Sequence, residues 1–360
     1  MNKNLIAIAL GAAFAIPNSA FADTKVYGKF NIGFENQKDE IQLDKKYAER
    51  TWVFKDQNNS SRLGFKGDQD VGVADLKVIY QLEYGIDPDG SEGAPFSERN
   101  IFVGLKGGFG AVQFGKYDTP VKNAGAKTDL FNDQSIGDIG SLLVGETRQN
   151  NMFQYASPKM FDALQLTVAI VPGEGRTAVD DATDTEKGVA DTWYASAVYE
   201  SKLFYGSVSY AGHEAGGLKF DGPTAAVDII RGAVSVEPVT DLEIGALIQQ
   251  AKGVDQDNAT TGTPPVPSGA VNGGDYKETT WLVSTGYTIS ALKLKAQYGQ
   301  TKGDKTDIKR NELALGFDYK LSKSLVTQAY YVGYKDKDRT VGGIADPKTS
   351  VYGVAMVYSF

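Results

Sequence analysis

Apolar and polar residues alternate one by one through many short segments of this 360-residue chain. Between residues 76 and 84, Leu76, Val78 and Tyr80 fall on one side of an extended chain, while Lys77 and Gln81 fall on the other. A period of two is the repeat of a β-strand whose two faces meet different surroundings. Further segments with this alternation lie at 26–34, 164–170, 292–298 and 313–321. The pattern therefore predicts an all-β fold.

The connections between the alternating segments come in two lengths. Short turns are expected near 68–72, 107–110, 157–162, 201–202, 237–241, 290–291 and 322–324. Longer polar loops alternate with them, at 36–60, 86–98, 117–146, 172–190, 212–226, 252–278, 302–309 and 335–349. Short turns at one end and long loops at the other are typical of a transmembrane β-barrel with a periplasmic and an extracellular rim. The long loops predict an antiparallel barrel of about 16 strands.

Two other folds would also produce alternating strands, namely a soluble β-sandwich and a secreted β-helix. Neither accounts for the last segment, in which Tyr352, Val354, Met356, Tyr358 and Phe360 recur at a period of two up to the final residue. A barrel closes by pairing its first and last strands, and it needs no tail beyond the last one. The barrel is therefore the preferred prediction.

The first 22 residues are typical of an export signal. Lys3 lies in a short polar start, the apolar run LIAIALGAAFAI follows, and Ala20-Phe21-Ala22 has the small-x-small pattern of a cleavage site. A membrane anchor is the alternative, but this apolar run is too short to cross about 30 Å of hydrocarbon. We expect residues 1–22 to be a signal peptide and residues 23–360 to form a single transmembrane barrel domain.

Composition excludes several kinds of function. The chain has no cysteine and a single histidine, His213, which excludes disulfides, thiolate chemistry and metal sites made of several histidines. A net charge of −8 argues against a nucleic-acid partner, because such binding normally rests on a basic surface. No cofactor, no metal and no enzymatic activity are expected.

Five blocks in order resemble the general diffusion porins of Gram-negative bacteria. They are VYGKFNIGF at 26–34, SRLGFKGDQDVG at 61–72, LKVIYQLEYG at 76–85, RNIFVGLKGGFGAVQFGKYDTP at 99–120 and RQNNMFQYASP at 148–158. The resemblance implies a homotrimer in the outer membrane, in which each barrel keeps its own pore and the third long loop folds into it. It also implies that the terminal aromatics Tyr358 and Phe360 form the signal that the barrel assembly machinery reads.

The resemblance further assigns two opposed rows of charge to the narrowest part of the pore. The basic row would be Lys29, Arg62, Arg99 and Arg148, and the third loop, 117–146, would supply the acidic row of Asp129, Asp133, Asp138 and Glu146. Alternation independently turns Lys29, Arg62 and Arg148 inward. Arg99 is left open by alternation, because the neighbouring segment 101–105 is apolar on both faces. The alternative is that these charges are solvated in the lumen and play no part in selectivity.

These features predict a water-filled channel for passive diffusion of small hydrophilic solutes and ions. Opposed charged rows would orient dipolar solutes, and the negative net charge favours a mild preference for cations. The expected partners are a second and third copy of the chain, outer-membrane lipid and lipopolysaccharide.

Three alternative functions remain open. An enzymatic barrel would need His213 as a base. A substrate-specific oligosaccharide channel would need aromatic residues along the lumen, for which Trp52 is a candidate, whereas Trp193 and Trp281 are typical of a membrane interface. An adhesin or divalent-ion-binding surface would use the acidic loop segments 180–184 and 255–258, although the spacing of the second is wrong for a calcium loop.

Overall fold

The computed structural model describes residues 24–39, 51–56, 60–90, 94–174, 176–177, 185–186, 188–220, 226–254, 276–341 and 344–360. The predicted signal peptide and the acidic segments 180–184 and 255–258 lie outside these ranges. Within the described residues, no helix is long and apolar enough to cross a bilayer.

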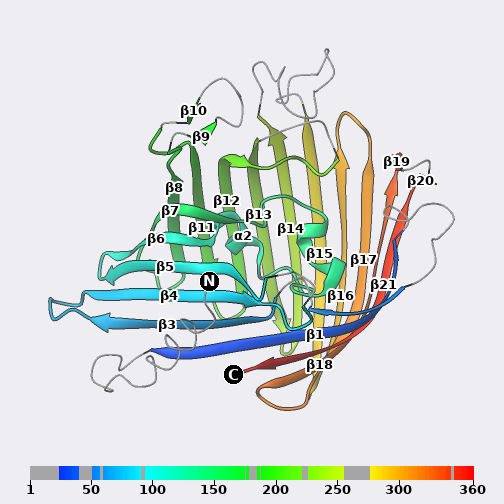
Figure 1. The fold of residues 1–360 in the computed structure, drawn as a ribbon, viewed down its shortest axis with the longest axis horizontal. Helices are drawn as coiled ribbons and strands as arrows, with labels where there is room; N and C mark the ends of the chain where they lie inside the picture. Colours follow the sequence, from blue (N-terminus) through cyan, green and yellow to red (C-terminus); the bar gives the residue numbers. More distant parts are fainter. Residues whose placement is uncertain are drawn as a thin grey trace.

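The strands form one closed antiparallel sheet (Figure 1). Strand β1 (Lys25–Asp39) pairs with the last strand, β21 (Lys348–Ser359), along one edge. Its other edge pairs first with β3 (Arg62–Asp70) and then with β2 (Thr51–Asp56), so β2 and β3 are two pieces of one barrel strand. The 17 strands of this sheet in the described residues therefore occupy 16 positions around the barrel, and the prediction of about 16 strands is confirmed.

The remaining barrel strands follow in chain order around the sheet. They are β4 (Lys77–Ile86), β5 (Phe96–Gly107), β6 (Gly110–Asp118), β7 (Arg148–Ala156), β8 (Leu164–Val171), β11 (Thr192–Glu200), β12 (Phe204–Ala215), β13 (Ala226–Val239), β14 (Leu242–Gly253), β15 (Lys277–Ile289), β16 (Leu292–Gly303), β17 (Lys309–Lys320) and β18 (Leu325–Lys337). Two small hairpins extend the loops: β9 (Arg176–Thr177) with β10 (Thr185–Glu186), and β19 (Thr340–Val341) with β20 (Ile344–Ala345). Short turns gather at one end of the barrel and long connections at the other (Figure 1).

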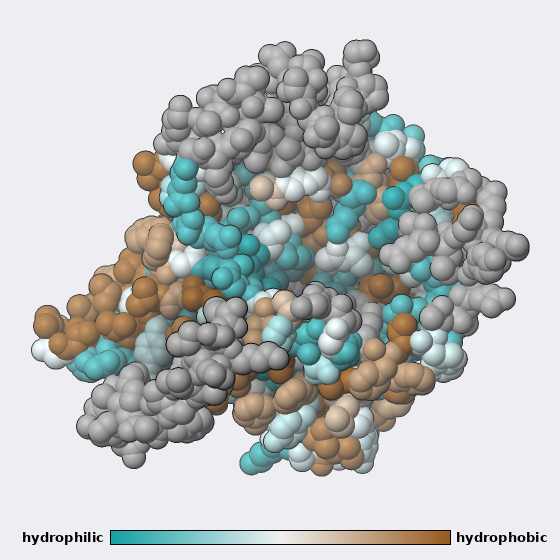
Figure 2. All heavy atoms as spheres, in the orientation of Figure 1, coloured by the Kyte–Doolittle hydropathy of each residue, from teal (hydrophilic) through white to brown (hydrophobic). Residues whose placement is uncertain are grey.

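The alternation of residue types separates an apolar outer face from a polar lumen. On β15, Trp281 and Val283 are exposed on the outside, whereas Leu282 and Ser284 point inward and are buried. Hydrophilic residues gather in the hollowed centre of the molecule, and hydrophobic residues cover its left and lower margins (Figure 2). In a bilayer, this outer face is covered by lipid, so its apolar side chains leave water on insertion.

Aromatic side chains form pairs on the outer face at two levels. Near the long loops lie the pairs Phe34–Trp52, Trp193–Tyr210, Trp281–Tyr298 and Tyr331–Tyr352, and near the short turns lie Tyr199–Phe204 and Tyr358–Phe360. Two such girdles mark the two interfaces of a membrane, because aromatic rings favour the level of the lipid headgroups.

The barrel closes at Phe360. Its backbone N–H donates to the carbonyl of Gly28 at 3.1 Å, and the N–H of Gly28 donates back at 3.0 Å. The Phe360 ring packs directly against Gly28, where a Cβ would clash with it, so a larger residue at position 28 would displace the ring. The role of Tyr358 and Phe360 in assembly stays a prediction.

The third long connection, between β6 and β7, lies inside the barrel. It contains helix α2 (Pro120–Gly125) and the 3₁₀ turns η2 (Ser135–Gly137) and η3 (Ile139–Ser141). Thr119 caps α2 by accepting from the N–H of Lys122 at 3.2 Å, and Pro120 begins the helix, where its missing N–H costs nothing. The expectation that this loop folds into the barrel agrees with the structure.

The hydrophobic core of the protein lies between this loop and the inner wall. Phe131 is fully buried against Ala314 and Val332, and the partly buried Leu130 packs beside it. Another loop segment buries its apolar residues against β13, β14 and β15. This second group comprises Ile139, Leu142 and Leu143 from the loop and Ala233, Leu247 and Leu282 from the wall. Burying each of these large apolar side chains contributes about 2 kcal/mol, which stabilises the loop in this position.

Candidate functional site

Polar side chains of the wall hold the third loop by its backbone carbonyls. Ser207 and Tyr205 both donate to the carbonyl of Ala124, at 2.7 and 2.9 Å. Ser284 donates to Thr128 at 2.7 Å. Thr301 and Gln297 make equivalent bonds to Leu142 and Gly137. A loop that leaves its own backbone groups unpaired can enter the barrel because inward-facing wall residues satisfy them.

Arg231 on β13 joins the two ends of the loop. Its side chain is fully buried and donates to the carbonyls of Val121 at 3.0 Å and Val144 at 2.9 Å. The same guanidinium forms an ion pair with Glu146 at 2.5 Å and donates to Gln249 at 2.8 Å. A planar group with five N–H donors suits this position, because several acceptors converge there.

Asp133 of the loop contacts two of the predicted basic residues. Lys29 donates to its carboxylate at 2.8 Å, and Arg62 lies 3.6 Å from the same oxygen. Lys29 and Arg62 are direct partners in the register of β1 and β3, so adjacent strands bring both cations to one carboxylate. Burial alone would raise the pKa of Asp133, but Lys29, Arg62 and Arg99 together outweigh it and lower the pKa below its ordinary value. Asp133 is therefore ionised at neutral pH.

Arg99 lies at a bulge between β4 and β5. The pairing passes from Leu82 opposite Ile101 to Tyr84 opposite Glu98, which leaves Arg99 at the irregular step. The bulge turns the side chain toward Glu83, with which it forms an ion pair at 2.7 Å. Simple alternation could not place Arg99 for this reason.

The segment 101–105 is apolar on both faces because the inside of β5 meets the third-loop core. Ile101 and Val103 face outward, while Phe102 packs inward with its ring centroid 5.5 Å from that of Tyr117.

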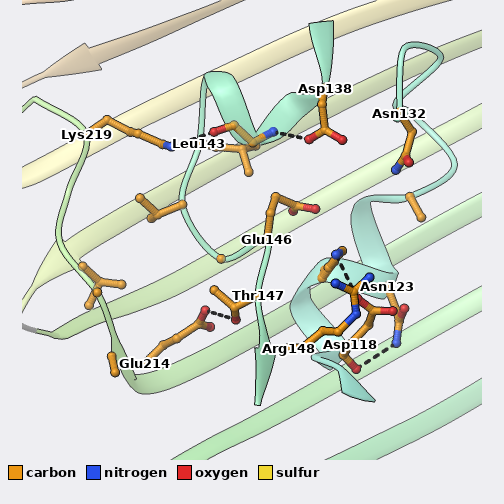
Figure 3. A pocket seen from close by; sticks show the side chains of 18 of the residues that line it. Asp118, Asn123, Asn132, Asp138, Leu143, Glu146, Thr147, Arg148, Glu214 and Lys219 are labelled. Atoms are coloured by element: carbon orange, nitrogen blue, oxygen red, sulfur yellow. Dashed lines mark hydrogen bonds and ion pairs between the residues drawn. The ribbon is translucent and has the colours of Figure 1, made fainter. Parts of the chain in front are cut away.

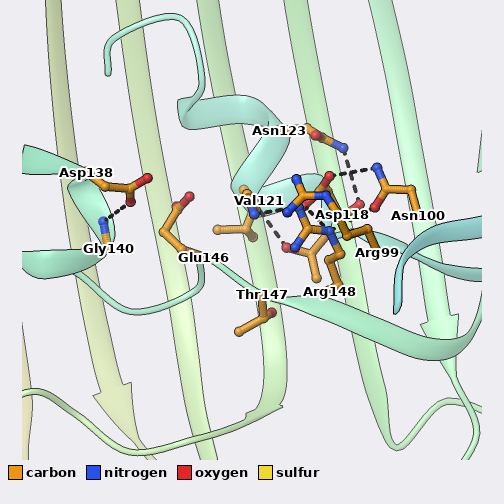
Figure 4. A network of polar contacts seen from close by, with 12 residues as sticks. Arg99, Asn100, Asp118, Val121, Asn123, Asp138, Gly140, Glu146, Thr147 and Arg148 are labelled. Atoms are coloured by element: carbon orange, nitrogen blue, oxygen red, sulfur yellow. Dashed lines mark hydrogen bonds and ion pairs between the residues drawn. The ribbon is translucent and has the colours of Figure 1, made fainter. Parts of the chain in front are cut away.

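Arg148 belongs to a network around Asp118 (Figure 4). Its guanidinium lies 3.2 Å from the Asp118 carboxylate and donates to the side chain of Asn100 at 3.0 Å. Lys122, on α2, reaches the same carboxylate at 2.8 Å. Asp118 thus balances two cations, one from the wall and one from the loop.

The four predicted loop carboxylates do not share one environment. Asp133, Asp138 and Glu146 line the lumen, and Asp138 accepts from the N–H of Gly140 at 2.8 Å. Asp129 is only 7% exposed, and its two oxygens accept from the N–H groups of Phe131 at 3.0 Å and Ile139 at 3.1 Å. This placement corrects the expectation for Asp129, which organises the loop from within and does not face the pore.

A cavity of about 640 Å³ lies between the loop and the basic wall (Figure 3). Its charged lining is balanced, with five cationic and five anionic residues. They are Arg62, Arg99, Lys122, Arg148 and Lys219, and Asp118, Asp133, Asp138, Glu146 and Glu214. Lys29 does not line this cavity, although it contacts Asp133 at its edge.

Several residues of this site were not predicted. Glu83, Asp118 and Glu214 lie on strands, and Lys122 and Lys219 lie in loops where charged residues are common. Asp118 and Lys122 had a usable signal, because both lie in the segment 117–146 expected to enter the pore, around the helix start Thr119-Pro120. Glu83, Glu214 and Lys219 become recognisable only when the barrel brings distant segments together.

Two residues considered for other functions lie away from the cavity. Trp52 stacks on Phe34 on the outer face with ring centroids 4.9 Å apart, so it does not contribute to a sugar path through the lumen. His213 lies near the end of β12 with its Nδ1 3.8 Å from Asp228, and it does not line the cavity. Among the described residues, no group of three or more His, Asp or Glu side chains could hold a metal ion.

A closed barrel with an apolar exterior, aromatic girdles and a charged lumen narrowed by an internal loop defines a transmembrane barrel of the porin type. The chain matches the family model of the Gram-negative porins over residues 7–340 and belongs to this family. The family is located in the outer membrane and is not enzymatic, which confirms both expectations for this chain.

Relatives in the genus Neisseria share part of the sequence. The major outer membrane protein P.IB of Neisseria gonorrhoeae is 34% identical over 131 residues, which cover 36% of each chain. The match thus spans little more than a third of that relative. The P.IA protein of Neisseria meningitidis serogroup A is 26% identical over 364 residues, covering 93% of this chain and 85% of the relative.

Two solved structures share the fold. The anion-selective porin from Comamonas acidovorans superposes with a TM-score of 0.74 at 19% identity and covers 94% of this chain and 99% of its own. OmpF of Salmonella typhi, in complex with daunomycin, superposes with a TM-score of 0.65 at 16% identity, with coverage of 94% and 97%.

Proposed function

We propose that the chain forms a water-filled channel through which small hydrophilic solutes and ions cross the outer membrane by passive diffusion, with a mild preference for cations. The observation that carries this proposal is the cavity in which loop carboxylates meet a row of wall cations. No bond is made or broken in this function. Solutes move down their own concentration gradients.

The two charged rows would act on a solute through its dipole. Lys29 and Arg62 lie on one side of Asp133, so a field crosses the constriction between the wall and the loop. Such a field orients dipolar solutes and ordered water, and a large or apolar solute must displace that water at a cost in free energy. The proposed roles of Lys29, Arg62, Arg99, Arg148, Asp133, Asp138 and Glu146 rest on this argument.

The ion preference is proposed to be weak because the cavity lining is balanced between positive and negative charge. The negative net charge of the chain, −8, favours accumulation of cations at the pore mouths. The structural neighbour from Comamonas acidovorans is described as anion-selective. A preference for anions is therefore the result to be compared with the proposed preference for cations.

The reversal potential in a planar bilayer tests this proposal. Under a KCl gradient we expect a sign that indicates cation preference, decreasing toward 1 M salt, where the Debye length is about 3 Å. A clear anion preference would refute the selectivity, and absence of conductance from correctly folded protein would refute the channel.

The proposed assembly is a homotrimer, as in the family that the sequence resembles. Chemical cross-linking of the purified protein in mild detergent should give a trimer as the largest product. Lipopolysaccharide and the barrel assembly machinery stay predicted partners.

A further inference from the structure

A second segment besides the third loop crosses the lumen. We call residues 216–220, which follow β12, the strap, and Figure 1 shows this connection running across the barrel mouth. The end of β12 directs it inward. The pairing of β12 with β13 shifts between Ala211 and Glu214, His213 has φ of 55°, and Gly216 has φ of 136°. Gly216 suits this bend because residues with a side chain rarely adopt such a φ.

The strap is held at three points. The backbone N–H groups of Lys219 and Phe220 both donate to the carboxylate of Glu278 on β15, the first at 2.9 Å. The Phe220 ring lies 5.0 Å from the guanidinium of Arg310 on β17. The partly buried Leu218 packs against the core beneath the third loop.

Lys219 reaches from the strap onto the third loop. Its Nζ donates to the carbonyl of Gly140 at 2.6 Å, beside Asp138, whose carboxylate accepts from the N–H of the same Gly140. Figure 3 shows Lys219 and Asp138 on one side of the cavity and Arg148 on the other, with Glu146 lying between the two sides. The side chain of Lys219 is exposed to the lumen, so its charge acts on solutes in this cavity.

Arg310 connects the strap to the third loop through the wall. Its guanidinium forms a bidentate ion pair with Asp336 at 2.7 and 2.9 Å, and it donates to the carbonyl of Ser141 in the loop at 3.1 Å. Because the same guanidinium contacts Phe220, Arg310 touches both the strap and the third loop.

We propose that Lys219 is a further selectivity-determining cation, which the strap places beside Asp138 and Glu146 and which offsets their negative charge in the lumen. The inference rests on the proposed channel function. Partial burial and the nearby Arg310 lower the pKa of Lys219, whereas Glu278, Asp138 and Glu146 act in the opposite direction. The ammonium of Lys219 thus interacts with Asp138 and Glu146, and it reduces the attraction of these two carboxylates for cations.

The test compares single-charge variants in planar bilayers. Lys219→Gln should raise the permeability ratio of K⁺ to Cl⁻ about two-fold, because a cation is removed from a narrow lumen. Lys219→Arg should retain the wild-type ratio. Lys277→Gln is the matched control, because Lys277 is an exposed lysine next to the inward-facing Glu278 on β15 and points to the outside of the barrel. It removes the same charge and should leave the ratio unchanged.

A second background separates the charge of Lys219 from damage to the strap. If Lys219 acts on Asp138, the effect of Lys219→Gln should be smaller in an Asp138→Asn protein than in the wild type. Equal shifts for Lys219→Gln and Lys277→Gln, or no shift for Lys219→Gln in a protein that conducts, would overturn the inference and leave the channel function intact. A wild-type protein without conductance would refute the channel function itself.

Discussion

At the scale of single residues, Asp133 and Asp129 show that two carboxylates four positions apart can have unrelated roles. Asp133 meets Lys29 and Arg62 at the edge of the cavity, and Asp129 accepts backbone N–H groups within the loop. The charge of Asp133 is therefore available to ions in the lumen, whereas the carboxyl oxygens of Asp129 serve as acceptors that organise the loop.

Asp133→Asn should shift ion preference toward anions. The substitution removes the negative charge beside Lys29 and Arg62, so these cations are no longer balanced at the constriction. We expect the K⁺ to Cl⁻ permeability ratio to fall about two-fold in a bilayer measurement. Asp129→Asn is the control, and a shift of equal size in that variant would contradict the separate roles of the two carboxylates.

Asp129→Ala and Asp129→Asn should differ in stability. Alanine removes the acceptor of two buried N–H groups and should cost about 1–3 kcal/mol, while asparagine retains one acceptor oxygen. Burial raises the pKa of Asp129 well above its ordinary value, and Asp138 adds to the effect.

The raised pKa of Asp129 predicts how the stability of Asp129→Asn relative to the wild type depends on pH. A carboxyl group whose pKa is raised on folding stabilises the folded state most when the pH is below its ordinary value, and this stability is lost as the pH rises through the raised value. The always-neutral Asp129→Asn should therefore gain stability relative to wild type at neutral pH, and the gain should vanish below about pH 4. Thermal transitions followed by heat-modifiable gel migration measure this, and a gain that grows on acidification would contradict it.

The strand alternation was enough to predict that Lys29, Arg62 and Arg148 point inward, because these residues follow regular pairing. It was not enough for Arg99, whose direction depends on a bulge. Nor could alternation separate Asp129 from Asp133, since both lie in a loop whose internal hydrogen bonds are not encoded by a periodic pattern.

At the scale of elements, the third loop depends on Arg231. The guanidinium holds residues from both ends of the loop, Val121 and Val144, and it forms an ion pair with Glu146. Such a fully buried charge is tolerated because it is paired with a carboxylate and its Nε and both Nη atoms donate to acceptors.

Arg231→Met should loosen the third loop without preventing barrel formation. The methionine fills part of the space but leaves Glu146 and the carbonyl of Val121 without the Arg231 donor, which costs about 3–5 kcal/mol locally. Gln249 still donates to the carbonyl of Val144. We expect larger and noisier single-channel currents, because the loop no longer keeps one position in the lumen. Lys202→Met, in the short turn between β11 and β12, is the control and should leave the currents unchanged. Unaltered conductance in Arg231→Met would show that the other wall contacts suffice.

The resemblance to porins predicted that the third loop folds into the pore. The position of the loop on the wall could not be derived from the sequence alone. The wall residues that hold it, such as Ser207, Ser284 and Thr301, are ordinary inward-facing polar residues of β-strands. The strap at 216–220 was missed for a similar reason, because its anchors Glu278 and Arg310 lie far away in sequence.

At the scale of the whole molecule, alternation and loop asymmetry were sufficient to predict the barrel and its strand number. Both signals follow from the environment, because one face of every strand meets lipid and the other meets water. The place of β2 in the barrel wall was not predicted, since the segment 36–60 appeared as one long polar loop although its residues 51–56 pair with β1.

The most direct test of the channel is the swelling of proteoliposomes that contain the purified protein in a series of uncharged sugars of increasing size. The structure places a cavity of about 640 Å³ between the third loop and the basic wall, so entry should depend on solute size and polarity alone. We expect swelling rates that decrease steeply with sugar size and increase linearly with sugar concentration. Rates that saturate with concentration, or that match those of vesicles without protein, would contradict passive diffusion through a water-filled pore.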